Sequence, residues 1–399
     1  LTNVIDLKKT TLANSYRKKK IDSKKLRKIP LVVSLCKYCN HLQLRYIANP
    51  KLMFNDYLYV SGTSKITKDH FKLYSIELLR VSKIKKKSQY KLIEIASNDG
   101  TFLDNFDHNK NMIVGIDPAK NLKKVALRKS RIIIDDYFDY KKSIEIKKKY
   151  GLFDFIVANN VFAHVKNLNS FTKGVSNLIS NVGIFVFEVS YLPNVIKKKT
   201  FDTIYHEHMS YHSLNPLIKF FQKFGLEIFD FDLIDAQGGS IRIYISHKNS
   251  KKVNKKKISL QIKKELDNKV FSVKTYIQFY KDILNQKKRL RIILDKLKNK
   301  GLDIIGYGAP AKLTTLSHVL DLTNKDLKVV IDDNQLKQHR FVPGKRIIIK
   351  NSTYLKNLKS AYIIILAWNF FDSIKIKCKK INKKFMFIRP FPIPKIVKY

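Results

Sequence analysis

Four ionisable or hydrogen-bonding side chains follow one another in Tyr205-His206-Glu207-His208, with Tyr211 shortly after. An imidazole with an ordinary pKa near ~6.5 can take up and return a proton at neutral pH, which suits a general base. In a strand or turn, Tyr205 and Glu207 would share one side and the two histidines the other. The segment therefore predicts a proton-transfer site, with a loop of satisfied polar residues as the alternative. Zinc binding by the histidines is disfavoured, because no third and fourth ligands follow at a recognisable spacing.

A second polar group is the turn Ser97-Asn98-Asp99-Gly100, between an apolar stretch and a helical pattern. Such a turn lets the backbone approach a ligand at the carboxyl end of a parallel strand. Asp117 lies 18 residues beyond Asp99 at the end of the next apolar stretch, where an acid can accept hydrogen bonds from both ribose hydroxyls. Glu94 would lie within the first strand and Asn159-Asn160 at the end of a later one. An ordinary turn is the alternative, but Asp117 at this spacing favours a nucleoside site.

Two further turns contain glycines that could lie near phosphate. Gly238-Gly239 precedes a strand that carries Arg242, although such glycines usually serve turn geometry alone. Gly306-Tyr307-Gly308-Ala309-Pro310-Ala311-Lys312 resembles a Gly-x-Gly-x-x-Ala loop, and a helix N-terminus with Lys312 in its first turn favours pyrophosphate. This weak pattern is supported by Asp332, about twenty residues later, and by Arg340.

The elements around these motifs alternate between strand and helix patterns after residue 90. Alternation of this kind predicts an α/β fold, built from βαβ units with a parallel sheet covered by helices. The expected strands are residues 91–96, 112–117, 131–134, 153–158, 183–188, 226–233 and 240–246. Seven strands that end in a hairpin are typical of a class I methyltransferase sheet.

The flanking segments follow other patterns. Residues 31–46 place strand-like positions around Cys36-x-x-Cys39, and helical spacing runs from about residue 65 to 85. Helical spacing also fills 258–300, as one long helix or two joined ones ending at Gly301. A second alternation follows, with strands at 302–307, 328–331, 346–349 and 361–367 and a helix at 311–320. We therefore predict an N-terminal module (1–85), a methyltransferase-type domain (86–250), a helical linker (251–300) and a smaller C-terminal Rossmann-like α/β domain (301–399).

Length and composition exclude several protein classes. With 399 residues, 44% hydrophobic and 12% aromatic, the chain can fill two or three cores, which excludes global disorder. No apolar run approaches the ~18 residues of a membrane span, and the N-terminus lacks a basic-then-apolar signal segment. Three cysteines cannot build a disulfide framework, which favours a reducing cytoplasm.

The net charge of +47 comes mainly from lysines spread along the whole chain. A nucleic-acid binder would concentrate charge on one face, interleave stacking aromatics and use arginine for base edges. We therefore expect a solvated basic surface and no nucleic-acid partner, with a basic nucleic-acid-binding protein as the non-catalytic alternative. The basic field would still attract anionic small molecules such as nucleotide sugars.

Five blocks of residues occur in order along the chain. They are Leu12–Leu44 with its Cys pair, Tyr57–Ser64, Glu94–Gly100, Tyr205–His208 with Gly238–Arg242, and Gly306–Asn369. Together they resemble the S-adenosylmethionine-dependent nucleotide-sugar C-methyltransferases, which add a carbon branch to deoxysugars. The resemblance implies a zinc-binding N-terminal module, a class I methyltransferase domain and a C-terminal Rossmann-like domain that helps to hold the nucleotide sugar.

The resemblance also implies roles for individual residues. A carbon beside a ketone must lose a proton before it attacks a methyl sulfonium, which requires a base and donors for the enolate oxygen. His208 would be that base, and the residues around the sugar would be Glu207, Tyr205, Tyr59 and His164. S-adenosylmethionine would be held by Glu94, Ser97, Asn98, Asp99, Gly100, Asp117, Pro118, Asn159 and Asn160. The nucleotide sugar would be held by Arg242, Gly308, Lys312, Asp332, Arg340 and Trp368.

The chain departs from this family in its cysteines. The family uses two Cys pairs, whereas only Cys36 and Cys39 are present, and residues 3–15 resemble the stretch after the first pair. We expect either that the natural protein extends before Leu1 or that this member has lost the metal, since two thiolates bind zinc poorly.

Other activities remain alternatives at this point. An O- or N-methyltransferase of the same superfamily would use similar base chemistry. An NAD-dependent sugar oxidoreductase is disfavoured, because the loop at residues 97–100 lacks the Gly-x-Gly spacing that pyrophosphate contact requires. The sequence does not predict an oligomeric state.

Overall fold

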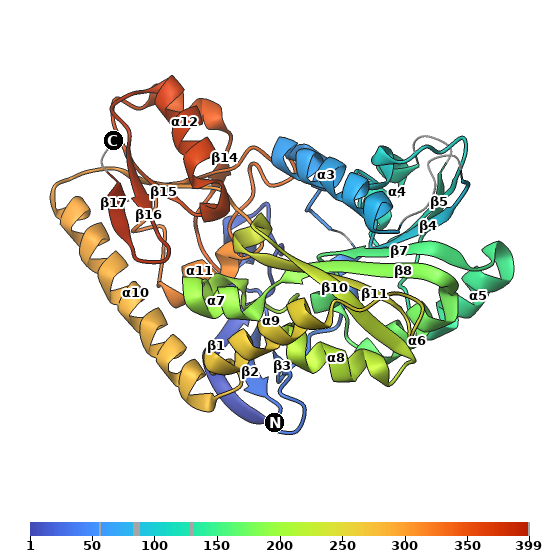
Figure 1. Cartoon of the computed structure of the whole chain (residues 1–399). Helices are drawn as coiled ribbons and strands as arrows, with labels where there is room; N and C mark the ends of the chain where they lie inside the picture. The colour runs from blue at the N-terminus through green and yellow to red at the C-terminus, as the bar shows by residue number, and fades with distance from the viewer. Residues whose placement is uncertain (56, 83–87, 128–130, 398–399) are drawn as a thin grey trace.

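The computed structural model describes residues 1–55, 57–82, 88–127 and 131–397, which form three sheets with helices packed around them (Figure 1). A four-stranded sheet contains the N-terminal strands, a seven-stranded sheet forms the centre of the chain, and a six-stranded sheet lies near the C-terminus. No helix within the described ranges is both long and apolar enough to span a bilayer.

The N-terminal sheet is antiparallel, in the order β1-β2-β3-β9. Its strands are β1 (Thr2–Thr11), β2 (Lys28–Leu35), β3 (Leu42–Leu44) and β9 (Ser210–Tyr211). The predicted strands around the Cys36-x-x-Cys39 turn are β2 and β3, whereas β1 was not predicted. β9 follows His208 within the segment predicted as methyltransferase domain, yet it pairs with β3. The last strand of the N-terminal sheet is therefore formed by the residues that directly follow the Tyr205–His208 segment.

The central sheet has the strand order β10-β11-β8-β7-β4-β5-β6. Its strands are β4 (Lys91–Ile95), β5 (Met112–Ile116), β6 (Ile132–Ile134), β7 (Phe153–Asn159), β8 (Ile179–Ser190), β10 (Leu226–Ile234) and β11 (Ser240–His247). All neighbours are parallel except β11, which is antiparallel to both β8 and β10. Successive strands are added on one side of β4 as far as β6, and from β7 onward on its other side, where the sheet ends in the antiparallel hairpin of β10 and β11. This is the class I methyltransferase arrangement, so the predicted fold class is confirmed.

Helices cover both faces of this sheet. On one face lies α3 (Lys65–Ser82), whose Phe71, Tyr74 and Leu78 pack with Phe155 and Val157 of β7. The alternate residues of β7, Ile156 and Ala158, pack on the other face. There they meet α5 (Tyr140–Tyr150), α6 (Leu168–Leu178) and α8 (Leu214–Gln222). A strand buried on both faces needs a continuous apolar run, which explains why β7 was recognisable in the sequence. The predicted residues 83–85 of the helix lie outside the described ranges.

Shorter helices complete the first two parts of the chain. They are α1 (Lys20–Lys24), α2 (Lys51–Phe54), α4 (Lys123–Ala126) and α7 (Leu192–Lys198). The single-turn 3-10 helices that matter for the site are η1 (Ser61–Thr63), η4 (Phe162–His164) and η5 (Phe201–Thr203).

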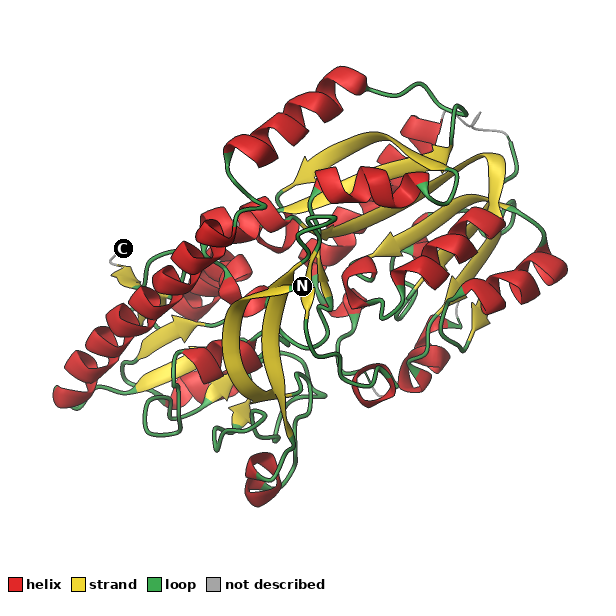
Figure 2. Ribbon diagram, turned by 90° about the horizontal axis from the view of Figure 1, so that it is seen from below, coloured by secondary structure: helices red, strands yellow, loops and turns green. Residues whose placement is uncertain are grey.

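Two helices, α9 (Lys255–Asp267) and α10 (Val273–Asn299), occupy the predicted linker. Of the two expectations, one long helix or two helices, the second is therefore the one observed. Glu265 of α9 fixes this region to the central domain, because its carboxylate accepts hydrogen bonds from the backbone amides of Leu214 and Asn215 and from the Tyr191 hydroxyl. Figure 2 shows α10 running alongside the C-terminal part of the chain.

The C-terminal sheet has the order β14-β13-β12-β15-β16-β17 and is parallel except for β17. Its strands are β12 (Ile304–Tyr307), β13 (Val330–Ile331), β14 (Ile349–Lys350), β15 (Tyr362–Ile365), β16 (Met386–Arg389) and β17 (Lys395–Val397), with helices α11 (Leu313–Val319) and α12 (Phe371–Ile381). The first four strands and α11 correspond to predicted elements, while α12, β16 and β17 were not predicted.

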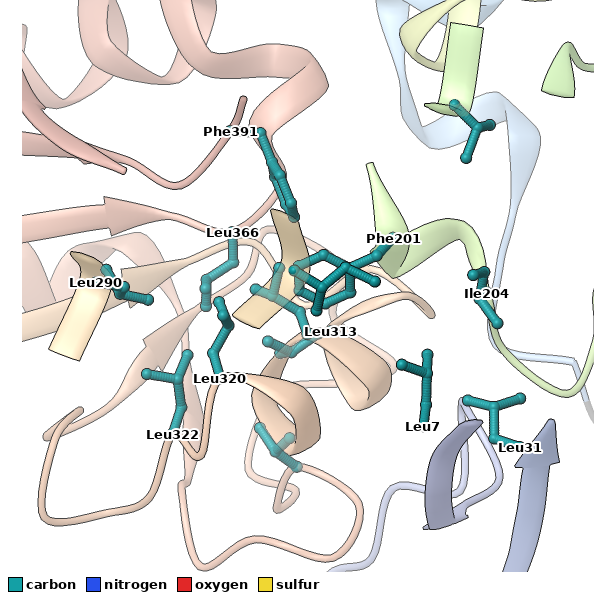
Figure 3. Packing of buried hydrophobic residues seen from close by; sticks show 14 of the residues in the cluster. Leu7, Leu31, Phe201, Ile204, Leu290, Leu313, Leu320, Leu322, Leu366 and Phe391 are labelled. Carbon is teal, nitrogen blue, oxygen red and sulfur yellow. The ribbon is translucent and has the colours of Figure 1, made fainter. Parts of the chain in front are cut away.

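One hydrophobic cluster joins the N-terminal sheet and the C-terminal domain to the segment that follows β8 of the central sheet. It contains Leu7 and Leu31 from the N-terminal sheet, Phe201 from η5, and Leu366 and Phe391 from the C-terminal domain, all buried (Figure 3). Full burial of a side chain of this size stabilises the fold by about 1.5–3 kcal/mol. The segment that leads into Tyr205–His208 is therefore held at the junction of all three parts.

Candidate active site

The loop after β4 is fixed by Asp117. The Asn98 amide donates to Asp117 Oδ2 at 2.8 Å, and the Ala119 amide donates to Oδ1 at 2.8 Å. Asn98 has φ +53° and Gly100 has φ +76°, so the loop turns through left-handed backbone geometry at both residues. Burial raises the pKa of the Asp117 carboxyl above its usual value. The turn after β4 and the acid after β5, which the sequence predicts to form one site, are thus in direct contact.

Unpaired polar atoms gather beside this loop. Glu94 is 2% exposed, and its Oε1 accepts a hydrogen bond from Asn159 Nδ2 at 3.0 Å. The buried Glu94 Oε2, Ser97 Oγ and Asn159 Oδ1 find no hydrogen-bond partner within the described part of the chain. Burial raises the pKa of Glu94 well above its usual value, and the hydrogen bond from Asn159 and the charge of Arg131 oppose this only in part. A cationic ligand with hydrogen-bond donors fits this site, and S-adenosylmethionine carries both a sulfonium and an amino group.

The segment before α3 covers the same loop. The Gly62 amide donates to Asp99 Oδ2 at 2.9 Å, and the Ser61 amide donates to Asn98 Oδ1 at 2.9 Å. Asn98 Nδ2 in turn donates to the Tyr59 carbonyl at 3.1 Å. A Cβ at Gly62 would lie 2.5 Å from Asp99 Oδ2, so glycine permits this close approach. The side chains of Asn98 and Asp99 therefore fix residues 59–62 against the loop.

The Tyr205–His208 segment forms a turn, in which the His208 amide donates to the Tyr205 carbonyl at 2.9 Å. The turn brings the Tyr205 hydroxyl within 3.0 Å of His208 Nε2, while His206 Nε2 contacts the Ile29 carbonyl at 3.2 Å. The expected division, with the two histidines on one side, is therefore wrong. It assumed the alternation of a strand, whereas a tight turn places residues three apart together.

His208 has a defined proton arrangement. Its Nδ1 lies 2.7 Å from the Thr203 carbonyl, which can only accept, so Nδ1 carries the hydrogen. Nε2 then has the free electron pair and accepts from the Tyr205 hydroxyl. Burial lowers the pKa of His208 to about 4, because the charged form is poorly solvated there. His208 is thus a neutral base with Nε2 as its basic atom.

Glu207 points to the N-terminal module. It is fully buried, and its two oxygens accept hydrogen bonds from Asn14 Nδ2 at 2.9 Å and from the Tyr57 hydroxyl at 3.1 Å. Burial raises its pKa to about 7, although these hydrogen bonds and the nearby Lys337 act in the opposite direction. Sequence reasoning assigned no role to Asn14 or Lys337, because only the folded chain brings them to Glu207.

The proton-transfer residues and the loop after β4 are neighbours. The Tyr57 ring lies 6.4 Å from the Tyr59 ring, and the Tyr59 carbonyl is bound to Asn98. On the other side, the His164 ring lies 5.0 Å from the His208 ring, and η4, which contains His164, follows the Asn159-Asn160 end of β7. Asn160 has φ +55° and donates its amide to the Glu188 carbonyl, and Pro118 is half-buried beside Asp117.

Lys312 and Trp368 reach the same junction from the C-terminal domain. Lys312 Nζ lies 4.0 Å from the centre of a Trp368 ring and donates to Asn369 Oδ1 at 3.2 Å. Trp368 Nε1 donates to Asp202 Oδ2 at 2.6 Å. Burial raises the pKa of Asp202, which the charge of Lys312 opposes. Asp202 precedes the predicted site by three residues, and no motif marked it.

The second glycine loop is filled by the protein's own side chains. The Ala309 amide donates to Asp332 Oδ2 at 2.5 Å, while Lys337 Nζ and the Tyr16 hydroxyl each donate to the Ala309 carbonyl at 2.8 Å. The backbone of Gly308, with φ +93°, packs directly against Ala367. Arg340 is half-buried beyond this loop. Contacts with a nucleotide sugar at Gly308, Asp332 and Arg340 stay predictions.

Arg242 has a different environment from the expected one. It is 4% exposed, its guanidinium donates to Glu188 Oε2 at 2.9 and 3.2 Å, and it lies 3.6 Å from the Tyr74 ring centre. His70 Nε2 contacts the same carboxylate at 3.0 Å. Arg242 is therefore engaged in a buried ion pair, and the predicted phosphate contact stays a prediction that these contacts do not support.

Cys36 and Cys39 lie on the turn between β2 and β3, where the Asn40 amide donates to the Cys36 carbonyl at 2.8 Å. Hydrogen bonding to Cys39 lowers the pKa of the Cys36 thiol. However, in the ranges that the structure describes, no group of three or more His, Cys, Asp or Glu side chains is placed to hold a metal ion. These two thiols alone do not fit a structural zinc site.

Comparison with known proteins agrees with this arrangement. Three family models match in chain order: a zinc-binding domain at residues 1–54, a methyltransferase domain at 67–230 and a C-methyltransferase C-terminal domain at 235–392. The C-methyltransferase NovU from Streptomyces niveus is 29% identical over 369 residues, which cover 92% of this chain and 87% of NovU.

Two solved structures with similarity each match less than half of the chain. An S-adenosylmethionine-dependent methyltransferase from Clostridium acetobutylicum is 11% identical with a TM-score of 0.35, over 45% of this chain and 92% of the other. Magnesium protoporphyrin IX methyltransferase from Synechocystis is 9% identical with a TM-score of 0.34, over 46% and 82%.

The matched family models span nearly the whole chain, the central sheet has the class I topology, and the loop beside Asp117 fits the methyl donor. The chain is therefore an S-adenosylmethionine-dependent methyltransferase that is similar to C-methyltransferases over nearly its whole length.

Proposed function

We propose that this enzyme transfers a methyl group to the carbon beside the ketone of a nucleotide-linked keto-deoxysugar, with His208 as the general base. The observation that carries the proposal is the proton arrangement of His208. Its Nδ1–H is bound to the Thr203 carbonyl, so Nε2 is left as the basic atom. Tyr57, which binds the neighbouring Glu207, and Tyr59 connect this segment to the loop of Asn98 and Asp117. S-adenosylmethionine, when bound, supplies an electrophilic methyl group.

His208 Nε2 would accept the proton from the carbon beside the ketone, and the electron pair of that C–H bond would form an enolate. Burial keeps the pKa of His208 at about 4, so the imidazole is neutral at cellular pH. The Tyr205 hydroxyl already donates to Nε2 and would be displaced by the substrate carbon. The enolate electrons would then form the carbon–methyl bond while the bond between that methyl group and the sulfonium sulfur breaks, with S-adenosylhomocysteine as the leaving group.

Neutral phenols would stabilise the enolate oxygen. Burial raises the pKa of Tyr57 and Tyr205 well above the usual value, so both hydroxyls remain hydrogen-bond donors. Donors placed where negative charge develops lower the barrier without reorganisation during the reaction. Tyr59 and His164 border the same cluster. Glu207 holds the Tyr57 hydroxyl in position.

Lys312 and Trp368 support a substrate with an anionic, ring-containing extension. They lie on the C-terminal domain, and Trp368 is bound to Asp202, three residues before Tyr205. An ammonium group can bind phosphate and an indole can pack against a flat ring. A sugar held at His208 could therefore carry a nucleotide toward this domain.

Mass spectrometry of a nucleotide-linked keto-deoxysugar incubated with the enzyme and methyl-labelled S-adenosylmethionine tests the proposal. We expect one labelled methyl group on the carbon next to the ketone. The same reaction run in D₂O should exchange the hydrogen at that carbon in wild type but not in His208→Asn. A labelled oxygen or nitrogen atom, or no reaction with any keto-sugar nucleotide, would reject the proposed substrate.

A further inference from the structure

The imidazole of His208 is oriented by a carbonyl five residues earlier in the chain. Thr203, whose carbonyl accepts Nδ1–H at 2.7 Å, is the last residue of the short turn η5. A single 3-10 turn has no regular structure that would fix its orientation by itself. The direction of the Thr203 carbonyl therefore depends on what holds η5.

The C-terminal domain holds η5 from outside. Trp368 Nε1 donates to Asp202 Oδ2 at 2.6 Å, and the rings of Phe201 and Trp368 both lie 5.4 Å from the Phe391 ring. Thr315 Oγ1 donates to the Ile204 carbonyl at 2.7 Å, just after the turn. Figure 3 shows Phe201 near Phe391 of the C-terminal domain, and the cluster that contains both also contains Ile204.

Asp202 is the polar attachment in the centre of this contact. Its side chain is fully buried, and among the described residues Oδ1 lacks a hydrogen-bond partner, so the Trp368 indole is its close donor. A buried carboxylate that loses its donor must either move toward water or take up a proton. The backbone amides of Asp202 and Thr203 also lower the pKa of this carboxyl by hydrogen bonding, so either response would act on the peptide between Asp202 and Thr203.

We infer that Asp202 and Trp368 are positioning residues through which the C-terminal domain aims the Thr203 carbonyl at Nδ1 of His208. The pair thereby keeps the hydrogen on Nδ1 and leaves Nε2 as the basic atom. Its value for catalysis rests on the proposed role of His208, whereas the orientation of the imidazole can be measured without any substrate.

The test uses side-chain NMR of ¹⁵N-histidine-labelled, ligand-free protein, with the His208 signals assigned by their loss in His208→Asn. Wild type should show His208 with the hydrogen on Nδ1. Trp368→Phe keeps an aromatic ring and removes the donor, so we expect a mixture of both tautomers and a kcat about tenfold to hundredfold lower. The dissociation constant of S-adenosylmethionine should stay within about twofold.

Substitutions at Asp202 separate positioning from general disruption. Asp202→Asn keeps an oxygen that can accept from the indole and should retain the wild-type tautomer, whereas Asp202→Ala should show the same mixture as Trp368→Phe. Because Trp368 is the sole tryptophan, its fluorescence reports whether the indole keeps its place in Asp202→Asn and in Asp202→Ala. Tyr362→Phe, at the start of β15 in the same domain, is the matched control and should leave the His208 signals unchanged.

An unchanged His208 tautomer in both Trp368→Phe and Asp202→Ala would overturn the inference. A changed tautomer with full methyl-transfer activity would support the positioning role and reject His208 as the base. The two proposals can therefore fail separately.

Discussion

Asp117 and Asp332 occupy matching positions in two different sheets. Each lies at the tip of the strand beside a glycine-containing loop and accepts a hydrogen bond from that loop, from the Asn98 amide at 2.8 Å and the Ala309 amide at 2.5 Å. Their surroundings differ. Near Asp117 lie buried polar atoms without partners in the described ranges, whereas the loop beside Asp332 is bound by Lys337 and Tyr16. The first loop therefore leaves polar atoms that a ligand could satisfy, whereas the second is filled by the protein.

This difference predicts that two equivalent substitutions affect S-adenosylmethionine binding to different extents. Asp117→Ala should weaken S-adenosylmethionine binding by at least about tenfold, because hydrogen bonds to a charged acceptor are worth about 1.5–3 kcal/mol. Asp332→Ala removes the equivalent carboxylate and should leave that affinity within about twofold. Isothermal titration calorimetry of both variants, after their unfolding temperatures confirm folded protein, provides the measurement. An unaltered dissociation constant in Asp117→Ala would contradict the ribose contact.

His208→Asn should bind S-adenosylmethionine normally but lose methyl transfer by at least about 100-fold, since a general base contributes factors of about 10²–10⁴. The asparagine amide can replace the Nδ1–H donor to the Thr203 carbonyl but provides no base at the position of Nε2. His339→Asn is a suitable control, because His339 is exposed and its φ of +60° suits asparagine. Turnover of His208→Asn at the wild-type rate would remove His208 from the mechanism.

The sequence was informative where one residue pattern determined one local structure. The continuous apolar run of β7 and the turn after β4 both follow from neighbouring residues, and the spacing to Asp117 follows from the βαβ repeat. The topology of the central sheet could therefore be predicted in advance. The short strands β16 and β17 carry weaker periodicity, and their pairing depends on a domain that is already folded.

Contacts between distant segments were not predictable in the same way. The pairing of β9 with β3 joins residues about 170 positions apart, and Glu207 meets Asn14 across 193 positions. Nothing in a local pattern specifies such a partner. The hydrogen bond from Trp368 to Asp202 likewise joins residues 166 positions apart.

Arg242→Met should reduce stability. Although burial opposes it, hydrogen bonds from His70 and Arg242 hold the pKa of Glu188 below its usual value, so the buried carboxylate is charged. Removing one partner of a buried ion pair costs about 3–5 kcal/mol, which urea unfolding can measure. We expect the KM for the sugar nucleotide to stay within about threefold. A large rise in KM with unchanged stability would instead favour the phosphate contact expected from the sequence.

Glu207 predicts a specific pH dependence of stability. Its pKa of about 7 in the folded protein lies above the ordinary value of 4.5, so the folded state holds a proton that the unfolded state has released between these pH values. The free energy of unfolding should therefore fall as pH rises from 4.5 to 7, by up to about 3 kcal/mol, and stay constant above that range. Glu207→Gln cannot ionise and should lack this loss.

Urea unfolding of wild type and Glu207→Gln between pH 4.5 and 8.5 measures this contribution as the difference between the two proteins. The free energy of unfolding of Glu207→Gln should increase relative to that of wild type as pH rises, because burial penalises only the ionised carboxylate. Glu145→Gln, at an exposed ion pair with Lys142, is the matched control and should give a difference that varies by less than about 1 kcal/mol. A difference for Glu207→Gln that stays constant across this range would show that Glu207 is ionised throughout, with Asn14, Tyr57 and Lys337 compensating its charge.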